Sequence, residues 1–553
     1  MKIFERVIKL AIVAVKLGLV ILKLAALALN LALVAIMLAL GTIKLARVAA
    51  NYYLWTWTYW RRRGIPGPMG FPILGTALKI MDFEIPPPAH LKKWTQQYGE
   101  SYGITLGLSR TLVISDPKLV QEVLVNQYDN FYGRNLNAIQ GDPNQDKRVH
   151  LFAAQGHRWK RLRTISSPTF SNNSLRKLKT TIEDSALELL RHIEEQTAGG
   201  KPIELLTFFQ EFTLDVIGRI ALGQTDSQIF KNPMLPYVRA VFGEPRKGLF
   251  LTGLVAPWIA PTLRKFVFSF PNIIKNPAVH LIRQTQEAVE KRISQRMADE
   301  KGGIEPGEPQ DFIDLFLDAK SDDVGLQDNE DFTKTGIKVT KQLTTDEVVG
   351  QCFVFLVGGF DTTALSLSFS SFLLATHPEI QKKLQEEVDK CCQDPEISFD
   401  QLAKLKYMEC VIKETLRMYP LAAVANSRRC MRATKIGPFD IEKGVDIMCD
   451  TWTIHRDTTI WGADANEFKP ERWELGDEHV FSKGGFIPFG LGPRQCIGMR
   501  LAYMEEKLLL CHVLRKYTLR ACKQTQIPMK LVGSRTTQPE SVWMELVARE
   551  DKN

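Results

Sequence analysis

The residue with the clearest chemical potential is Cys496, which stands in the glycine-rich run FGLGPRQCIG (489–498), directly before an apolar segment with helical periodicity. Glycines let such a loop turn tightly, so the backbone N–H groups that open the following helix would point toward the sulfur. These donors and the helix dipole favour a thiolate over a thiol. Since the motif contains no histidine, it indicates metal binding rather than acyl transfer, and Arg494 offers a positive charge to an anionic group bound beside it.

A second group of notable residues lies inside a predicted helix over residues 344–376, which opens with a TTDE capping box. The segment is apolar on nearly all sides, so we expect a buried helix. Its middle reads GGFDTT (358–363), and each helical glycine costs about 1 kcal/mol relative to alanine. Two of them indicate that a flat or bulky group approaches the backbone. A buried acid such as Asp361 is costly unless it is paired or transfers protons, and a glycine kink with a solvated aspartate is the structural alternative.

Charged residues recur on two further predicted helices. Glu414 and Arg417 lie side by side at positions i and i+3, and as an exposed pair they would contribute less than about 1 kcal/mol. Arg472, in the turn FKPERW, could complete a charge triad with them. The segment HRWKRLR places Trp159 and Arg163 four residues apart on one helical face, which suits carboxylate binding, with a basic, solvated helix as the alternative.

The elements that must position these residues are mostly helical. From about residue 76 the sequence predicts amphipathic helices, one of them over residues 398–419, with strands at 109–116 and, around a turn, at 435–449. Residues 249–274 are apolar, but prolines and two basic residues interrupt them. That excludes a second membrane span and leaves two interpretations, buried core or a surface that dips into a bilayer. With no internal repeat and no second core, we predict one large, mainly α domain.

Composition narrows the class of protein. The 553 residues carry a net charge of +9, which is modest for this length and gives little support to nucleic-acid binding. The nine cysteines form no CxxC motif and no paired spacing, which argues against a disulfide framework or a structural zinc site. A reducing, cytosol-facing compartment is therefore expected.

Residues 1–64 are predicted to be a membrane anchor. The run between Lys23 and Lys44 has no charge, and about 20 such residues span the roughly 30 Å hydrocarbon core of a bilayer. NYYLWTWTYW and three arginines follow, as expected for an interfacial flank. A mostly polar stripe with a seven-residue period from Lys2 onward would also suit a helix lying in the interface plane, and balanced flanking charges leave the orientation open. The Pro- and Gly-rich segment 64–75 is predicted to be a stiff, extended connector.

Taken together, these motifs resemble those of the cytochrome P450 superfamily. FGLGPRQCIG matches the family's haem-binding loop, F-x-x-G-x-R-x-C-x-G, at every position. ETLR is similar to its Glu-x-x-Arg helix, FKPERW to the following turn, GGFDTT to its oxygen-activating centre and HRWKRLR to its W-x-x-x-R helix. The motifs occur in the family's order, and the chain looks closest to the animal clan that contains the drug-metabolising family-three enzymes. The resemblance implies the cytochrome P450 fold, mainly α with small β-sheets, as a haem-thiolate catalytic domain of residues 65–553 that follows the membrane helix.

The resemblance also implies roles for individual residues. Cys496 would be the axial thiolate ligand of the iron in haem b, and Asp361 and Thr362 would relay protons during oxygen activation. The other cofactor-binding candidates are Arg134, Trp159, Arg163, Gly358, Gly359, Phe489, Arg494 and Gly498.

Two further implications concern arginines. Glu414, Arg417 and Arg472 would form a structural network that braces the cysteine loop. Relatives often place another propionate-binding arginine a few residues after the counterpart of Pro420. Here the first arginine is Arg428, and whether it substitutes stays open.

The implied reaction is the insertion of one oxygen atom from O2 into a lipophilic small molecule, with electrons from NADPH through NADPH–cytochrome P450 reductase. Cytochrome b5 is a second candidate partner, and membrane lipid surrounds the anchor. Basic residues of the 157–163 helix, together with Arg500, would receive the acidic reductase. The implied location is the endoplasmic reticulum membrane, with the catalytic domain facing the cytosol.

Two other functions stay open at this point. One is a haem-thiolate isomerase or dehydratase that acts on lipid peroxides without a reductase, and the other is a non-catalytic haem carrier or sensor. The Asp361–Thr362 pair favours oxygen activation, because a rearrangement needs no proton relay. The apolar segments expected to line the pocket indicate a lipophilic substrate without identifying it.

Overall fold

The computed structural model describes residues 1–244, 247–270, 276–304, 307–309, 311–319, 342–474, 476 and 484–550. The chain forms two compact units, Met1–Tyr59 and Trp60–Asn553.

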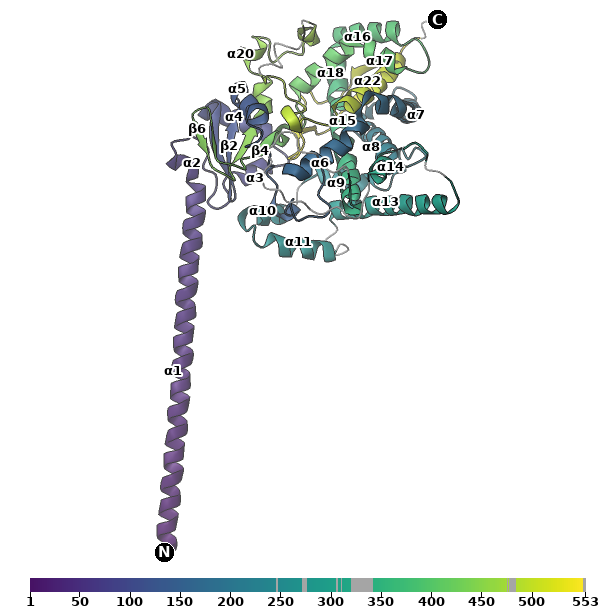
Figure 1. Cartoon of the computed structure of the whole chain (residues 1–553). Helices are drawn as coiled ribbons and strands as arrows, with labels where there is room; N and C mark the ends of the chain where they lie inside the picture. Colours follow the sequence, from purple (N-terminus) through teal and green to yellow (C-terminus); the bar gives the residue numbers. More distant parts are fainter. Residues whose placement is uncertain are drawn as a thin grey trace. The chain divides into compact units, whose positions relative to one another are not determined.

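The first unit is one long helix, α1 (Lys2–Trp57), drawn in purple in Figure 1. At 1.5 Å per residue its 56 residues extend for about 84 Å, whereas the hydrocarbon core of a bilayer is about 30 Å thick. The helix therefore continues well beyond the uncharged run between Lys23 and Lys44. Its apolar side chains are exposed, and its length and composition suit a membrane-spanning helix. These properties make α1 a candidate membrane anchor.

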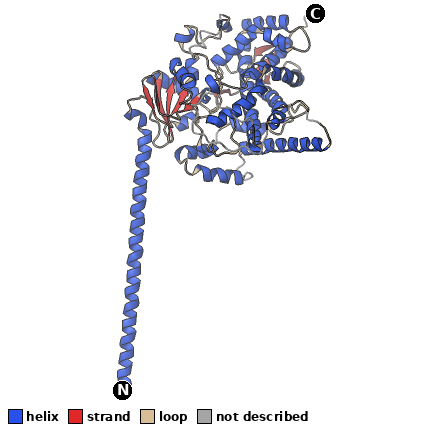
Figure 2. Cartoon of the chain, viewed as in Figure 1, coloured by secondary structure: helices blue, strands red, loops and turns tan. Residues whose placement is uncertain are grey.

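The second unit is mainly helical, as the blue ribbons of Figure 2 show, and this confirms the predicted fold class. The described α-helices after α1 are α2 (Tyr59–Arg62), α3 (Ala77–Ile80), α4 (Pro87–Tyr98), α5 (Pro117–Gln121), α6 (Gly156–Ser166), α7 (Asn172–Thr197), α8 (Leu205–Leu222), α9 (Leu235–Phe242), α10 (Lys247–Val255), α11 (Ala260–Ser269), α13 (Pro277–Lys301), α14 (Phe312–Asp318), α15 (Thr345–Thr376), α16 (Pro378–Cys391), α17 (Phe399–Lys404), α18 (Lys406–Met418), α19 (Thr451–Ile454), α20 (Thr458–Trp461) and α22 (Met499–Lys516).

Small sheets complete the second unit. The described strands are β1 (Ser101–Leu106), β2 (Ser109–Ile114), β3 (Ile203–Glu204), β4 (Ser427–Arg429), β5 (Thr434–Ile436), β6 (Phe439–Ile441), β7 (Asp446–Cys449), β8 (Tyr517–Ala521), β9 (Leu531–Val532), β10 (Gln538–Pro539) and β11 (Trp543–Ala548). They form the sheets β1-β2-β7-β4, β3-β11-β8, β9-β10 and β5-β6, in which the β2–β7 pair is parallel and the other pairs are antiparallel. The strands predicted at 109–116 and 435–449 are confirmed.

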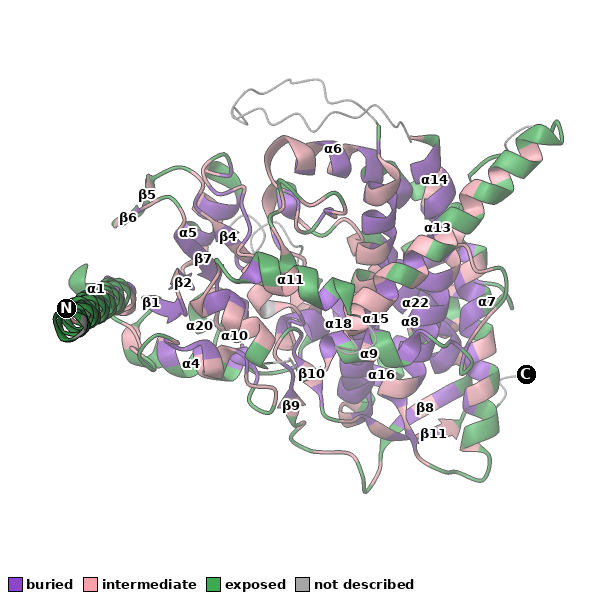
Figure 3. Cartoon of the chain, turned by 90° about the horizontal axis from the view of Figure 1, so that it is seen from below, coloured by how far each residue is buried: buried purple, intermediate pink, exposed green. Residues whose placement is uncertain are grey.

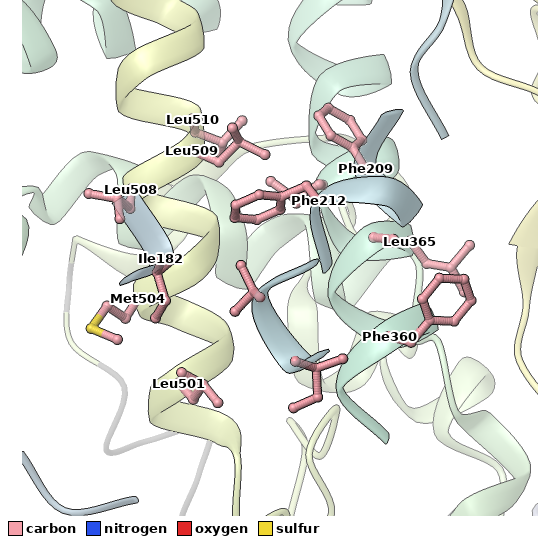
Figure 4. Close-up of a cluster of buried hydrophobic side chains, with 14 of the residues drawn as sticks. Ile182, Phe209, Phe212, Phe360, Leu365, Leu501, Met504, Leu508, Leu509 and Leu510 are labelled. Atoms are coloured by element: carbon pink, nitrogen blue, oxygen red, sulfur yellow. The ribbon is translucent and has the colours of Figure 1, made fainter. Parts of the chain in front are cut away.

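The core of this unit is built around α15. Its predicted capping box is present, and most of its residues are buried; Figure 3 colours buried residues purple. It packs against α8, α13, α18 and α22. Figure 4 shows part of the apolar cluster that joins them, with side chains such as Phe212 of α8, Phe360 of α15 and Leu509 of α22, none of which has exposed surface. The site residues on α15 are thus held from several sides.

The Pro- and Gly-rich segment 64–75, predicted to be a stiff, extended connector, also packs against the sheet. The Gly103 N–H in β1 donates a hydrogen bond to the Pro66 carbonyl oxygen at 2.8 Å. A Cβ on Gly67 would lie 2.0 Å from the Gly103 carbonyl oxygen, so only glycine permits this approach. The segment is extended, but it packs on the sheet through its backbone.

The single helix predicted over 398–419 is divided into α17 and α18. The capping box at its start is present, but the helix stops at Leu405, where ψ is 78°. A different helix caps the new start, because the Glu387 carboxylate of α16 accepts from the N–H groups of Tyr407 and Met408 at 2.7 and 2.8 Å. A distant carboxylate therefore satisfies the N–H groups that a continuous helix would have paired internally.

Residues 249–274 form α10 and α11 where the structure describes them, and 271–275 lie outside the described residues. The buried-core interpretation is wrong for much of this segment. Several of its large apolar side chains are more than two-fifths exposed: Trp258, Ile259, Phe266, Phe268 and Phe270. An apolar surface of this kind is typical of a contact with membrane or another apolar partner.

Candidate active site

The Cys496 loop is closed by its own backbone and by two left-handed glycines. The Cys496 N–H donates to the Phe489 carbonyl oxygen at 2.8 Å. Gly490 and Gly492 have φ angles of 76° and 72°. A Cβ on Gly492 would lie 2.1 Å from the Leu124 carbonyl oxygen, so this position requires glycine.

The Cys496 sulfur is surrounded by groups that favour its negative charge. Burial raises the pKa of the Cys496 thiol, while the N–H groups of Gly498 and Met499 and the Arg163 guanidinium oppose that rise. Gly498 has an ordinary φ of −86°, so its predicted part in turning the loop is wrong, and its contribution is an N–H aimed at the sulfur. Cys496 is exposed, so its sulfur is accessible to a ligand.

Three buried guanidinium groups lie close to one another near this loop, and we call Arg134, Arg428 and Arg494 the arginine cluster. Their exposed fractions are 8%, 1% and 6%, and the Nε atom of each has no hydrogen-bond partner among the residues that the structure describes. Burial, together with repulsion between the charges, lowers the pKa of Arg134 well below its usual value and that of Arg428 to about 10. Among the described residues, no carboxylate forms an ion pair with the cluster.

Backbone oxygens and aromatic rings hold the arginine cluster in place. Arg134 donates to the Ala425 carbonyl oxygen at 2.9 Å and lies over the Phe152 ring at 4.0 Å. Arg494 lies over the Trp159 ring at 4.8 Å, so Trp159 positions this guanidinium. These contacts orient the charges without neutralising them.

Arg163 is turned toward the cysteine loop. Its Nη1 donates to the Gln495 carbonyl oxygen at 2.9 Å. Two neighbouring arginines of α6, Arg158 and Arg161, pair instead with the buried carboxylate of Glu347, at 3.1 and 2.5 Å. The prediction that the basic residues of 157–163 receive a reductase is therefore wrong for Arg158 and Arg161, which join α6 to the start of α15.

The two glycines of α15 differ in their surroundings. Gly358 is exposed, and a Cβ there would meet no described residue within 4 Å, so it borders open space. A Cβ on Gly359 would lie 2.9 Å from Cδ1 of Ile217 in α8. The prediction gave both glycines the role of making room for a ligand. The structure supports this geometry for Gly358 only, because Gly359 allows α8 and α15 to cross closely.

Asp361 and Thr362 point into different environments. Thr362 is half-buried, and its Oγ1 donates to the Gly358 carbonyl oxygen at 2.7 Å. Asp361 is fully buried and accepts from Gln210 of α8 at 3.3 Å and from the Thr536 hydroxyl at 2.9 Å. Burial raises the pKa of Asp361 to about 6, although both hydrogen bonds act to lower it.

Glu414, Arg417 and Arg472, which we call the Glu414 cluster, lie together with every charge paired. Arg417 forms two bonds of 2.8 Å with the fully buried Glu414 carboxylate, and Arg472 adds a third at 2.8 Å. Trp473 and the Lys469 N–H also donate to it, both at 3.0 Å. The cluster satisfies both carboxylate oxygens, as a buried ion network must.

Two polar side chains that the sequence did not mark bond to Ile487, just before the cysteine loop, and one of them, His455, also bonds to the Glu414 cluster. Arg417 donates to the His455 carbonyl oxygen at 2.7 Å, and the His455 Nε2 accepts from the Ile487 N–H at 2.9 Å. Burial and the Arg417 charge lower the pKa of His455 well below its usual value, so the neutral ring can accept. Asn426 donates to the Ile487 carbonyl oxygen at 2.9 Å. The brace therefore reaches the chain just before Phe489.

Comparison with known proteins identifies the family. A family model described as cytochrome P450 matches residues 65–543. The chain belongs to the cytochrome P450 family. It is similar to the Caenorhabditis elegans cytochrome P450 CYP13A10, at 61% identity over 502 residues, which are 90% of this chain and 97% of the relative. It is 60% identical to CYP13A1 of the same organism over 507 residues, covering 90% of this chain and 96% of that one.

A cytochrome P450 is an oxidoreductase, a monooxygenase that carries haem b with a cysteine thiolate as axial ligand. The residues of this P450 fit that cofactor. Haem b carries propionate carboxylates, and the arginine cluster presents three buried cations with unpartnered Nε donors and no protein carboxylate among the described residues. An anion is what such a cluster lacks.

The P450 site contains residues that its sequence did not single out. Gln210 and Thr536 bond to Asp361 across 151 and 175 residues of chain, and no local pattern marks either of them. Arg428 had a signal, since it is the first arginine after the place where relatives carry one.

Proposed function

We propose that this P450 inserts oxygen from O2 into a lipophilic small molecule, with Cys496 as its haem ligand and electrons from NADPH through NADPH–cytochrome P450 reductase. The observation that carries the proposal is the pairing of two features. The Cys496 sulfur receives two backbone N–H donors at the start of α22, and the arginine cluster nearby holds uncompensated positive charge. One suits a thiolate and the other suits propionates.

The chain binds and orients the cofactor through named atoms. Bound there, haem supplies the activation of dioxygen. Arg134, Arg428 and Arg494 would bind the propionates, and Trp159 fixes the plane of the Arg494 guanidinium. Arg163 keeps a positive charge near the Cys496 sulfur through its bond to the loop backbone. Arg428 thereby takes the place of the arginine that the sequence lacks after Pro420.

Two residues of α15 would handle protons. The pKa of Asp361, about 6, lets its carboxyl exchange a proton near neutral pH. The Thr362 hydroxyl holds its proton on the Gly358 carbonyl oxygen and can redirect it into the open space beside Gly358. Since Asp361 is bonded to Gln210 and Thr536, its relay to Thr362 requires a change of rotamer or an intervening water.

Membrane attachment supports a lipophilic substrate and a membrane-bound electron donor. The exposed apolar α1 would anchor the protein in the endoplasmic reticulum, and the aromatic surface of α10 and α11 offers a second apolar contact. The catalytic unit would face the cytosol, where the reductase and cytochrome b5 supply electrons. Arg500, which is exposed and lies beside the cysteine loop, is a candidate docking residue.

Cys496→Ala tests the ligand assignment. The wild-type protein should give the red-shifted ferrous–carbon monoxide band of thiolate-ligated haem, and the variant should lose it. Cys522→Ala, which changes a half-buried cysteine of the C-terminal region, is the control and should keep the band. A normal band in Cys496→Ala would falsify the assignment.

Reaction class is tested by consumption of O2 and NADPH in the reconstituted protein. With added reductase and a lipid extract as substrate, product should form only when both are consumed. Turnover of a lipid hydroperoxide without O2 or reductase would instead show an isomerase or dehydratase. Tight haem binding without turnover of any lipid would indicate a carrier or sensor.

A further inference from the structure

Two cysteines outside the haem site lie in contact with each other. Cys392 follows the last residue of α16, and Cys511 lies in the middle of α22. Their Sγ atoms are 3.9 Å apart, and the two residues are 2% and 0% exposed. Since a disulfide has an S–S length of about 2.05 Å, a movement of about 2 Å would join the two sulfurs.

The surroundings of this pair favour a reactive thiol. Arg515 lies one helical turn after Cys511, and its positive charge acts on both sulfurs. The two thiols are in hydrogen-bond contact, and this contact, with Arg515, lowers the pKa of the Cys392 thiol, against the opposing effects of burial and the Glu387 and Asp394 charges. Cys392 adjoins the exposed residues 393–396, whereas Cys511 is enclosed within α22, so Cys392 is the thiol that an oxidant reaches first. Burial raises the pKa of the Cys511 thiol, its partner.

A route for a small oxidant lies beside the pair. The four residues 393–396 that follow Cys392 are exposed. The Arg515 side chain holds this loop by donating to the Asp394 carbonyl oxygen at 2.9 Å. Opening of this short surface segment would expose Cys392 without unfolding α22.

We propose that Cys392 and Cys511 are a redox modification site, and that a hydroperoxide converts them into a reversible disulfide. The Cys392 thiolate attacks the peroxide, the O–O bond breaks, and Cys392 sulfenic acid and an alcohol or water form. The Cys511 sulfur then attacks the sulfenic sulfur, its proton goes to the departing oxygen, and water leaves as the S–S bond forms. With hydrogen peroxide, two thiols and one peroxide give one disulfide and two waters. A dithiol reductant reverses the reaction.

The crosslink would join α16 to α22 and close the chain between residues 392 and 511. That loop contains the Glu414 cluster and the Cys496 loop, so the disulfide would secure the elements that brace the haem ligand. A crosslink over a loop of this length restricts the unfolded chain strongly. The apparent melting temperature of the oxidised protein should therefore rise by about 4 °C.

The test uses the full-length, haem-loaded protein exposed to hydrogen peroxide at graded concentrations. Free thiols are then blocked with one alkylating reagent, disulfides are reduced, and the released thiols are labelled with a second reagent. Peptide mass spectrometry should find Cys392 and Cys511 labelled together by the second reagent, and a crosslinked peptide should appear before reduction. Their reaction with the first reagent, applied under denaturing conditions, should fall by about tenfold or more, because a formed disulfide leaves no thiol. Treatment with a dithiol should restore it.

Variants separate this site from general cysteine oxidation. Cys511→Ala should abolish the crosslink and the peroxide-dependent rise in melting temperature, and should leave Cys392 as a sulfenic acid that dimedone traps. Cys391→Ser, which changes the half-buried neighbour of Cys392, should retain both effects. If Cys511→Ala loses its haem during purification, Cys392→Ser supplies the same test from the other side.

Two results would overturn the proposal. One is full alkylation of Cys392 and Cys511 at a peroxide dose that oxidises other cysteines of the folded protein. The other is a crosslink from Cys392 to Cys391 in place of Cys511. Neither result bears on the haem assignment, because Cys496 and its carbon monoxide band are monitored in the same samples.

Discussion

Two buried groups of arginines show how the same side chain serves two different purposes. In the Glu414 cluster, Arg417 and Arg472 share a fully buried carboxylate and also bond to backbone oxygens. In the arginine cluster, three guanidiniums are buried just as deeply, repel one another and have aromatic rings and carbonyl oxygens as neighbours. The positive charges of the first group are balanced by carboxylates of the chain itself. Those of the second group are balanced only when an anion binds.

Charge balance distinguishes a structural ion network from a ligand-binding site. A buried ion network with all partners present holds a shape, and here it reaches the cysteine loop through His455. A buried set of like charges is unfavourable alone, so its presence indicates a ligand of opposite charge. Asp361 lies between these extremes, since it is buried with neutral hydrogen-bond partners only.

Glu414→Gln should have the largest effect. The amide cannot balance the two guanidiniums, so unfolding free energy should fall by about 3 to 5 kcal/mol. Thermal unfolding and the haem content after expression measure the loss. Glu409→Gln, on the same helix, removes a carboxylate that pairs with Lys413 and Lys507 at 3.1 and 3.0 Å nearer the surface, and should cost less than about 1 kcal/mol. Equal losses of stability in the two variants would show that the buried Glu414 network contributes no more than the Glu409 ion pairs.

Arg428→Met should act in opposite directions on the empty and the loaded protein. Without haem, removal of an uncompensated buried charge should stabilise the chain by about 1 to 3 kcal/mol. With haem, loss of a propionate partner should speed haem transfer to excess apomyoglobin by about 10- to 100-fold.

Arg429→Met is the matched control for that comparison. Its guanidinium already pairs with the buried Asp446 at 2.8 Å. The substitution should therefore destabilise both forms and leave the rate of haem transfer nearly unchanged. If the two variants behave alike, the arginine cluster is not a propionate site.

Thr536→Val should have the smallest effect, on the pH dependence of stability. The folded-state pKa of Asp361, about 6, lies above its value of 3.8 in the unfolded chain, so the folded state holds the extra proton between these values. Stability from this group is complete below pH 3.8 and is lost as pH rises through about 6. The hydrogen bond from the Thr536 hydroxyl lowers the pKa of Asp361, so its removal should raise this pKa. The decline in stability should then extend to a higher pH, by up to about one unit.

Melting temperatures between pH 4 and 8 measure this shift. Thr537→Val changes the neighbouring buried hydroxyl and should leave the curve as in the wild type. Asp361→Asn removes the titrating group and should flatten it. A decline that keeps its position in Thr536→Val would show that the Thr536–Asp361 bond does not tune the carboxyl.

Much of the site was predictable because its residues sit in short, ordered motifs. The run around Cys496 predicts a loop at a helix start, and the capping box predicts where α15 begins. Other features had no local signal. The break between α17 and α18 depends on Glu387 of another helix. The packing of segment 64–75 depends on its backbone hydrogen bond with Gly103 of β1. The opposite roles of Gly358 and Gly359 depend on where Ile217 lies.

The amino-acid sequence by itself determined which local motifs the chain contains: a cysteine before a helix, an ion-pairing motif, a glycine-interrupted apolar helix and a long apolar N-terminus. These are local patterns, because backbone geometry and side-chain type act over a few residues. Only the tertiary structure decided which charges are balanced. Pairing depends on residues that meet across the core, as Arg472 meets Glu414 while Arg428 meets other arginines. Electrostatic energy in a buried site depends on distance in space, which the order of residues along the chain does not contain.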